Sequence, residues 1–365
     1  MGFRCGIVGL PNVGKSTLFN ALTKTAAAQA ANFPFCTIEP NIGDVAVPDE
    51  RLEKLADIAD SAQSIPARLS FVDIAGLVRG AAKGEGLGNQ FLGNIREVDA
   101  IAHVLRCFED GDITHVEGVI DPLADADTVD TELMLADLES LEKRAVNLQK
   151  KATTKDKAAM NELELVDLAL AELREGRPAR GADIPAGRER EFKNLQLITA
   201  KPVIYVCNVE EDAAGEGNSL SRKVQEKASA EGAEAVIISA RIEEELAQLD
   251  DAERLEYLQS LGLDEPGLNR LIRQGYDLLN LITYFTCGPK EARAWTVREG
   301  STAPQAAGVI HTDFERGFIR AETTAYDDYV GCQGEAGARE AGKLRQEGKD
   351  YLVRDGDVML FKFNV

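Results

Sequence analysis

The chain has 365 residues, of which 44% are hydrophobic and 28% charged, and its formal net charge is −21. This composition predicts a soluble, cytoplasmic protein of two or three domains, and it argues against a protein that coats a nucleic acid, DNA included, with its whole surface. No run approaches the roughly 18 apolar residues of a membrane span, so we expect no membrane partner. The six cysteines include no Cys-x2-Cys pair, so we expect neither structural disulfides nor a zinc site.

A glycine-rich loop stands near the N-terminus between a strand-like and a helix-like run. Residues Gly9–Ser16 read Gly-Leu-Pro-Asn-Val-Gly-Lys-Ser, after Phe3–Val8 and before Thr17–Leu22. Such a loop turns successive backbone N–H groups towards phosphate oxygens, and the following helix adds the positive end of its dipole. Lys15 is then expected to reach the β and γ phosphates, and the Ser16 hydroxyl to bind Mg²⁺. An ordinary glycine-rich turn is the alternative.

Two later segments supply the other groups expected around a triphosphate. The apolar run Leu69–Asp73 opens an Asp-x-x-Gly pattern, so Asp73 would support the metal, mainly through water, and the N–H of Gly76 would sense the γ-phosphate. Thr37, in the loop Asn32–Pro40, would add its hydroxyl to Mg²⁺. The many glycines after Asp73 predict a segment that orders and disorders with the γ-phosphate, although a plain surface loop has the same composition.

The residue that orients the attacking water is a separate question. Small GTPases carry Gln directly after Asp-x-x-Gly, but here that residue is Leu77, which cannot form hydrogen bonds, so we expect slow intrinsic hydrolysis. His103 lies in a strand-like run and is expected to be a satisfied core residue, while His311 is a candidate interaction residue. His115, on the loop after that strand, is the candidate catalytic residue, with an ordinary surface histidine as the alternative.

Changes in periodicity divide the chain into three modules. Residues 1–129 and 200–280 alternate short β-branched runs with helix-like segments, which predicts an α/β domain with a parallel sheet. Residues 130–199 carry Leu, Ala, Glu and Lys at helical spacing, which predicts an inserted helical hairpin that turns near Thr153–Asp156. Residues 281–365 predict a small α+β module around a helix at Pro304–Ile310.

Ten runs are predicted to be strands, five in each sheet-forming module. They are Cys5–Val8, Arg68–Val72, Ala100–Cys107, Pro202–Cys207 and Ala235–Ser239 in the α/β domain, and Thr283–Thr286, Ala294–Val297, Gly317–Glu322, Tyr351–Arg354 and Val358–Phe363 in the C-terminal module.

The motif that would read the base favours adenine. GTPases follow an apolar strand with Asn-Lys-x-Asp, whose carboxylate accepts two hydrogen bonds from the guanine edge. Here Val203–Cys207 is followed by Asn208-Val-Glu-Glu, so Lys has become Val209 and Asp has become the longer Glu211. Adenine lacks both guanine donors, so relaxing the guanine motif favours ATP. The segment Ser239–Arg241 stands where a Ser-Ala-Lys loop normally supports the base.

Together these motifs resemble the YchF, or Obg-like ATPase, family over essentially the whole chain. The matching segments are Gly9–Thr17, Asn32–Asn41, Asp73–Leu77, Asn208–Glu211 and Gly308–Glu322. The resemblance implies a P-loop NTPase of the G-domain type, with an inserted helical hairpin domain and a C-terminal TGS domain of β-grasp fold. It also implies an ATP-hydrolysing protein that is similar to translation GTPases of the Obg group and associates with ribosomes.

The motifs, the resemblance and the candidates considered above together give three expected sets. The nucleotide-binding set is Asn12, Val13, Gly14, Lys15, Ser16, Thr17, Gly76, Asn208, Val209, Glu211 and Ser239; the Mg²⁺ set is Ser16, Thr37 and Asp73; the catalytic set is Lys15 and His115. The expected partners are ATP, with GTP weaker, and the ribosome, as its large subunit or the whole 70S particle. A GTPase of the Obg type remains an alternative, as does a non-catalytic, nucleotide-gated factor that binds the ribosome or RNA, which Leu77 favours.

Overall fold

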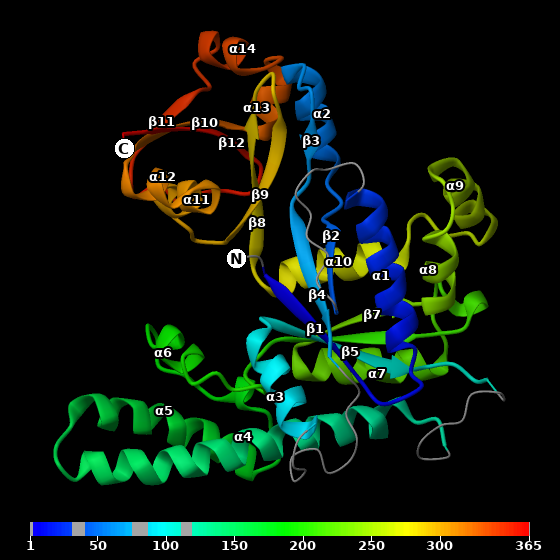
Figure 1. Ribbon diagram of the computed structural model, residues 1–365, viewed down its shortest axis with the longest axis vertical. Helices are drawn as coiled ribbons and strands as arrows, with labels where there is room; N and C mark the ends of the chain where they lie inside the picture. Colours follow the sequence, from blue (N-terminus) through cyan, green and yellow to red (C-terminus); the bar gives the residue numbers. More distant parts are fainter. Residues whose placement is uncertain (1–2, 31–40, 75–86, 111–118, 365) are drawn as a thin grey trace.

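The computed structural model describes residues 3–30, 41–74, 87–110 and 119–364 (Figure 1). A six-stranded sheet of order β2–β4–β1–β5–β6–β7 lies at its centre, and only β2 runs antiparallel to its neighbour. Its strands are β1 (Arg4–Val8), β2 (Ile42–Ala46), β4 (Arg68–Asp73), β5 (Ala100–Arg106), β6 (Val203–Asn208) and β7 (Glu234–Ile238). Every residue of β5 and β6 is buried, as in a sheet covered on both faces. The predicted parallel sheet is confirmed.

Helices cover this sheet. They are α1 (Lys15–Ala30), α3 (Leu87–Glu97), α7 (Ser219–Glu231), α8 (Ala240–Leu246) and α10 (Gly267–Leu278). Helix α2 (Glu50–Ala59) packs instead on the C-terminal sheet described below, and α9 (Asp251–Ser260) packs against α8. Helix α1 packs against β2 and α8, whereas α7 and α10 pack against β6 and β7. The ends of α7 follow from its sequence, because Asn218 and Ser221 form a capping box and Gly232 ends the helix in the left-handed conformation.

Two antiparallel helices form the predicted hairpin, α4 (Pro122–Ala152) and α5 (Lys157–Arg174). The turn falls where the sequence predicts it, and Asp156 caps α5 by accepting hydrogen bonds from two N–H groups of its first turn. The predicted division at residue 130 lies inside α4. The first turns of α4 pack in the core of the central sheet, and its later turns form a second core with α5. One continuous helix therefore connects the sheet to the hairpin.

A buried carboxylate fixes α4 to the segment that returns to the sheet through a 3-10 turn (Ala179–Gly181) and α6 (Glu189–Lys193). Asp137 is 1% exposed and accepts hydrogen bonds from the N–H groups of Ile198 and Thr199, at 3.0 and 2.8 Å, and from Thr199 Oγ1 at 2.8 Å. Burial raises the pKa of Asp137, and these donors oppose the rise.

Replacing Asp137 by Ala should lower the free energy of unfolding by about 3 kcal/mol, because buried donors lose their acceptor. Urea denaturation measures this change. Asp167→Ala, at an exposed position of α5, is the matched control and should shift stability by no more than about 0.5 kcal/mol. Equal midpoints for the two variants would contradict a structural role for Asp137.

The C-terminal residues form a second sheet of order β11–β10–β12–β8–β9–β3. Its strands are β8 (Leu281–Cys287), β9 (Ala292–Arg298), β10 (Phe318–Ala325), β11 (Arg345–Glu347) and β12 (Asp357–Phe363), with β3 (Ser64–Ile65) joining from the first half of the chain; the helices are α11 (Ala303–Ile310), α12 (Thr312–Arg316), α13 (Tyr326–Gly331) and α14 (Glu335–Glu340). Helix α11 packs on the sheet, where the Tyr284 hydroxyl donates to the carbonyl of Ala306 at 2.8 Å. This arrangement is consistent with the expected β-grasp fold.

The predicted strand at Tyr351–Arg354 is wrong. Within it, Leu352 forms only an isolated bridge with Thr302. The N–H of Arg354 donates to the carboxylate of Asp357 at 2.9 Å, so the chain turns there instead of continuing in a ladder. The other four predicted C-terminal strands are present, and the helix predicted at Pro304–Ile310 is α11.

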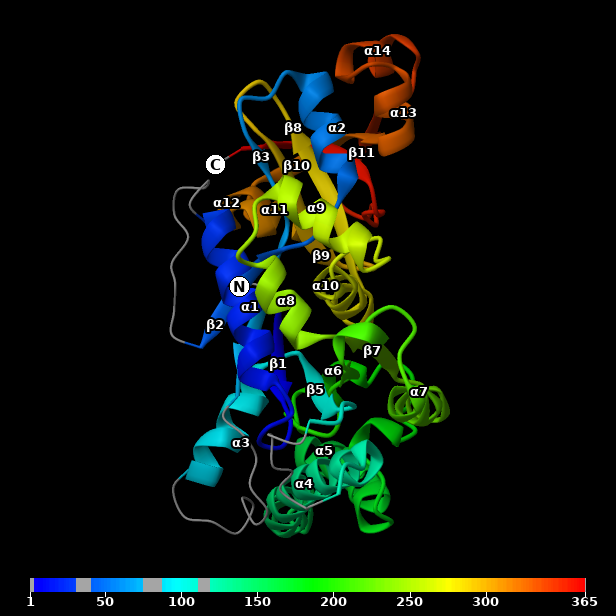
Figure 2. The same cartoon turned by 90° about the vertical axis from the view of Figure 1, so that its right-hand side faces the viewer.

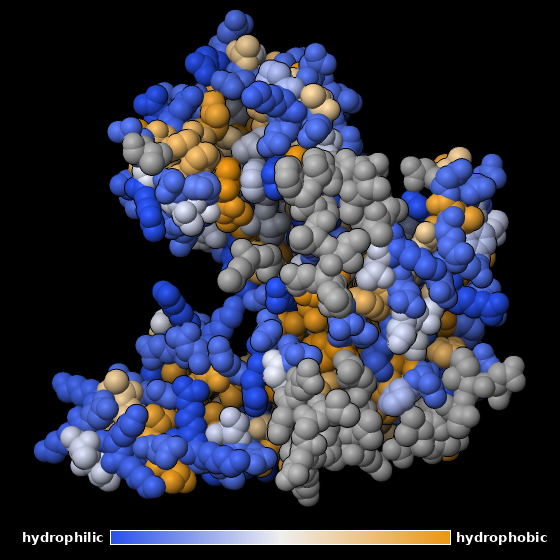
Figure 3. All heavy atoms as spheres, viewed as in Figure 1, coloured by the Kyte–Doolittle hydropathy of each residue, from blue (hydrophilic) through white to orange (hydrophobic). Residues whose placement is uncertain are grey.

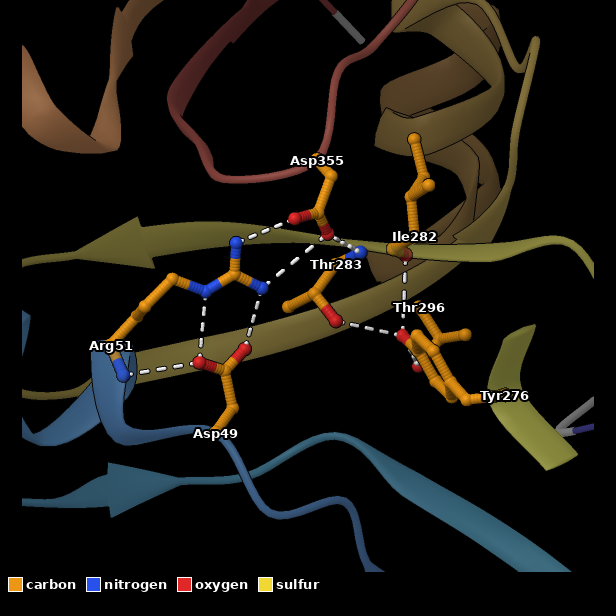
Figure 4. A network of polar contacts seen from close by, with 7 residues as sticks. All are labelled: Asp49, Arg51, Tyr276, Ile282, Thr283, Thr296 and Asp355. Atoms are coloured by element: carbon orange, nitrogen blue, oxygen red, sulfur yellow. Dashed lines mark hydrogen bonds and ion pairs between the residues drawn. The ribbon is translucent and has the colours of Figure 1, made fainter. Parts of the chain in front are cut away.

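A polar network joins the two sheets (Figure 4). The guanidinium of Arg51, in α2, donates two hydrogen bonds to Asp49, at 2.9 and 2.8 Å, and two to Asp355 of the C-terminal module, at 2.5 and 3.4 Å. Asp355 also accepts the N–H of Thr283 at 2.9 Å, and the Thr283 hydroxyl contacts that of Tyr276 in α10 at 2.8 Å. With the parallel pairing of β3 and β9, this network fastens the C-terminal module to the central domain.

The C-terminal module and the hairpin stand at opposite ends of the central sheet (Figure 2). Both project to the same side, and the space-filling view shows a hollow between them (Figure 3). In the described part of the chain, no helix combines the length and apolarity that crossing a membrane requires.

Candidate functional site

The glycine-rich loop leads directly from β1 into α1. Asn12 and Gly14 adopt positive φ angles of 64° and 97°, and the carbonyl of Gly14 accepts the N–H of Leu18 at 2.9 Å, which starts the helix. A Cβ atom on Gly14 would stand 2.2 Å from Nδ2 of Asn208. Both the left-handed backbone and this close approach require glycine at position 14.

The side chain of Lys15 lies beneath this loop. It is 8% exposed, and its ammonium donates to the carbonyl of Leu10 at 2.6 Å. Burial lowers the pKa of Lys15 to about 8, and the charge of Asp73 partly opposes the shift. Burial likewise raises the pKa of Asp73, and Lys15 opposes that shift. A cation and a carboxylate therefore lie near each other where β4 ends and α1 begins.

A cavity of about 680 Å³ opens at this edge of the sheet, within the usual size range of ligand sites. Its walls come from the glycine-rich loop, the start of α1, the segment after β5, the end of β6 and the start of α8. The lining residues are Asn12, Gly14, Lys15, Ser16, Thr17, Phe108, Glu109, Asp110, Asn208, Val209, Glu210, Glu211, Ser239, Ala240, Arg241 and Glu244. We call this space the loop cavity.

Asn208 joins the two halves of the loop cavity. The residue is 6% exposed; its Nδ2 donates to the carbonyl of Val13 at 2.9 Å, and its Oδ1 accepts the N–H of Ala240 at 2.9 Å. Both ends of the amide are thus engaged within the protein, so Asn208 holds the glycine-rich loop against β6 and α8. The side chain of Val13 is fully buried, which leaves only its backbone available to a ligand.

The structure brings together most of the sequence-predicted nucleotide-binding residues. All of those in its described part line the loop cavity except Val13, which lies directly behind it. Thr37, Gly76, Leu77 and His115 lie outside the described residues.

His103 is buried in the core, where its ring centroid lies 5.7 Å from that of Tyr205. Burial lowers the pKa of His103 to about 3, so the imidazole is neutral. Among the described residues its Nε2 has no hydrogen-bond partner, so the core location was predicted correctly but the satisfied hydrogen bonding was not. His311 is exposed and caps α12, accepting the N–H of Asp313 at Nδ1.

Sequence reasoning missed the wall formed by Phe108, Glu109 and Asp110. A signal was available, because these residues directly follow β5, and ligands of parallel sheets bind beyond the carboxyl ends of the strands. The same signal applies to Glu210, two residues after β6, whereas Glu244 carries none, since its position depends on how α8 packs.

The donor set near the loop suits a hard cation. Ser16 offers a hydroxyl in the first turn of α1, and Asp73 offers a carboxylate at the end of β4. Within the described ranges, no cluster of three or more His, Cys, Asp or Glu side chains could hold a metal by itself. Mg²⁺ is commonly held by one or two protein oxygens together with substrate phosphates, so these residues fit it.

Comparisons with known proteins agree with this architecture. A family model described as a 50S ribosome-binding GTPase matches residues 4–138, and the C-terminal YchF-GTPase model, described as of unknown function, matches residues 281–364. Proteins named ribosome-binding ATPase YchF from Haemophilus influenzae and Bacillus subtilis are 59% and 51% identical, over 100% of both chains in each case.

Solved structures show the same likeness. The structure of the Schizosaccharomyces pombe YchF GTPase is 41% identical, with a TM-score of 0.89 over 99% of this chain and 98% of that one. A GTP-binding protein from Pyrococcus horikoshii, at 19% identity and a TM-score of 0.63 over 99% of this chain and 100% of that one, shares the fold.

Proposed function

The chain belongs to the YchF family, and from this premise we propose that it is an ATPase that associates with the ribosome and binds its nucleotide in the loop cavity. The observation that carries the proposal is the position of Lys15. Its buried ammonium lies under a loop of left-handed turns at the N-terminus of α1, beside the charge of Asp73. Such a site offers backbone N–H groups, a helix dipole and a cation to a phosphate chain.

Each residue of the site has a proposed role. Lys15 would stabilise charge on the β and γ phosphates, while Asn12 to Thr17 would bind them through backbone N–H groups and hydroxyls. Ser16 and Thr37 would hold Mg²⁺ and Asp73 would support it, mainly through water, and the bound ion would neutralise charge on the phosphates. Gly76 and His115 complete the proposal as the γ-phosphate sensor and the residue that positions water.

The base would lie between the ends of β6 and β7, next to Val209 and Ser239. The absence of the Lys and Asp of the guanine motif at positions 209 and 211 supports a preference for ATP over GTP. The hairpin and the C-terminal module would offer two surfaces to one large particle, because both project to the same side (Figures 1 and 3). We propose the large subunit or the 70S ribosome as that particle, in the cytoplasm.

Asp73→Asn tests the metal part of the proposal. The variant keeps the size of the side chain but loses its charge, so phosphate release from ATP should need about ten- to a hundredfold more Mg²⁺ for half-maximal rate. Asp57→Asn, at an exposed position on α2, should leave the Mg²⁺ dependence unchanged. An Mg²⁺ titration of Asp73→Asn identical to that of the unaltered protein would remove Asp73 from the metal site.

Pelleting of the protein with ribosomes, in the presence of ATP or ADP, tests the partner. We expect the pelleted fraction to differ between the two nucleotides.

A second experiment, single-turnover hydrolysis of ATP, tests catalysis. A rate no faster than that of the uncatalysed reaction, with or without ribosomes, would identify a non-catalytic, nucleotide-gated factor.

A further inference from the structure

Three carboxylates line the base end of the loop cavity, and each has a partner. Glu211 pairs with Nε of Arg241 at 2.9 Å, Glu244 pairs with Lys24 at 3.7 Å, and Glu210 accepts a hydrogen bond from Asn218 at 2.9 Å. A guanine ring would need a carboxylate with free acceptor positions to receive its N1–H and N2 amine. An adenine ring has neither the N1–H nor the N2 amine, so it does not need a carboxylate at the edge where guanine carries these donors.

The ion pair between Glu211 and Arg241 lies at the position that could distinguish guanine from adenine. Glu211 is the third residue after Asn208, the position of the guanine-reading carboxylate in the Asn-Lys-x-Asp motif. Arg241 is the second residue of α8 and follows Ser239 and Ala240, which line the same end of the cavity. The loop after β6 and the start of α8 thus bring an arginine to the carboxylate at the guanine-reading position of the motif.

Further contacts hold Arg241 in place. Its Nε also lies 3.8 Å from Glu245, one turn along α8, and the other oxygen of Glu245 accepts the hydroxyl of Tyr257 from α9. The arginine side chain is 75% exposed and that of Glu211 43% exposed. The pair is therefore accessible to a bound base, and its strength is that of a surface ion pair.

We propose that Arg241 is a specificity-determining residue of the nucleotide site. By pairing with Oε1 of Glu211 it occupies one of the two carboxylate oxygens that would accept the two guanine donors, so a guanine nucleotide must break the ion pair before both donors can bind. The preference for adenine then depends on this pair as well as on the altered motif. This inference rests on the proposed function, since it assigns a role within the same site.

The test is the ratio of the dissociation constants for GTP and ATP, measured by competition against one fluorescent nucleotide in the presence of Mg²⁺. Arg241→Ala should lower this ratio about two- to fivefold, the range that an exposed ion pair contributes. The ratio cancels the general weakening of anion binding when a positive charge is lost. Arg222→Ala, at an exposed position of α7, is the control for charge and should leave the ratio unchanged.

Two further variants show whether the change passes through Glu211. Arg241→Lys keeps a cation that can pair with Glu211, so its ratio should stay near that of the unaltered protein. In Arg241→Ala combined with Glu211→Gln, no carboxylate remains to be freed, and the ratio should return. An unchanged ratio in Arg241→Ala would overturn the inference. A lowered ratio that persists in the double variant, or that comes only from weaker ATP binding, would overturn it too.

The same measurements separate this inference from the proposed function. If the unaltered protein binds neither nucleotide, or prefers GTP, the proposed function fails. If it prefers ATP and Arg241→Ala leaves the ratio in place, the proposed function stands and only the role of Arg241 is lost.

Discussion

Replacing Lys15 by Ala should lower the affinity for ATP by at least about a hundredfold, because the ammonium would make charge-assisted hydrogen bonds to two phosphates. The fold should survive, since the substitution removes a buried charge that, in the described part of the chain, donates one hydrogen bond, to the carbonyl of Leu10, and has the charge of Asp73 nearby. Calorimetric titration measures the affinity, and thermal unfolding without nucleotide is the control for folding. ATP binding of normal strength by a folded Lys15→Ala variant would show that the nucleotide lies elsewhere.

The pKa of Lys15 gives the same prediction a pH dependence. Burial lowers this pKa to about 8, so in the free protein the ammonium loses its proton as the pH rises through that value. A bound triphosphate favours the charged form, so binding takes up a proton at alkaline pH. The affinity for ATP should therefore be nearly constant below a pH of about 7 and fall above a pH of about 8. The Lys15→Ala variant should lack this fall.

Replacing Gly14 by Ala should abolish measurable ATP binding and lower the free energy of unfolding by roughly 2–4 kcal/mol. The added Cβ would stand 2.2 Å from Nδ2 of Asn208, and φ at this position is 97°, so both a clash and backbone strain oppose the methyl group. Urea denaturation and calorimetric titration measure the two effects.

Gly93→Ala is the matched control for this substitution. Gly93 lies in α3, and a Cβ there would meet nothing within 4 Å, so the variant should be as stable as the unaltered protein or about 0.5–1 kcal/mol more stable. Asn208→Ala removes the clash but also both hydrogen bonds of the amide, so the losses of stability in Gly14→Ala and Asn208→Ala should be less than additive in the double variant. Equal stability of the Gly14 and Gly93 variants would contradict the close packing of the loop on Asn208.

The elements that the sequence predicts well have strong local signals. The parallel strands β5 and β6 are buried along their whole length, so they read as continuous apolar runs. The turn between α4 and α5 is marked by Asp156, whose side chain caps the second helix. The glycine-rich loop is recognisable because a phosphate cradle needs particular residues at fixed spacing.

The elements that the sequence does not predict depend on partners that are distant in the chain. Strand β3 has two residues and exists because it pairs with β9, more than 200 positions away in the chain. Strand β2 reads Ile-Gly-Asp-Val-Ala, a weak pattern, and Asp44 within it is held by the hydroxyl of Ser70 on β4. The wrong strand at Tyr351–Arg354 has suitable residue types, but the carboxylate of Asp357 takes the N–H of Arg354.

In the site, too, the contacts that depend on residues distant in the sequence could not be predicted. Residue types and spacing placed Lys15, Asn208 and Ser239 around one ligand, and the loop cavity contains all three. The engagement of both ends of the Asn208 amide was not predictable, because its partners Val13 and Ala240 come from separate loops. The ion pair between Glu211 and Arg241 likewise depends on how α8 packs beside the loop after β6.

Calorimetric titration of the full chain with ATP and with GTP, in the presence of Mg²⁺, tests the central claim most directly. We expect one ATP to bind per chain and GTP to bind at least about tenfold more weakly. Failure to bind ATP at millimolar concentration, or tighter binding of GTP, would contradict the assignment of the loop cavity as an adenine nucleotide site.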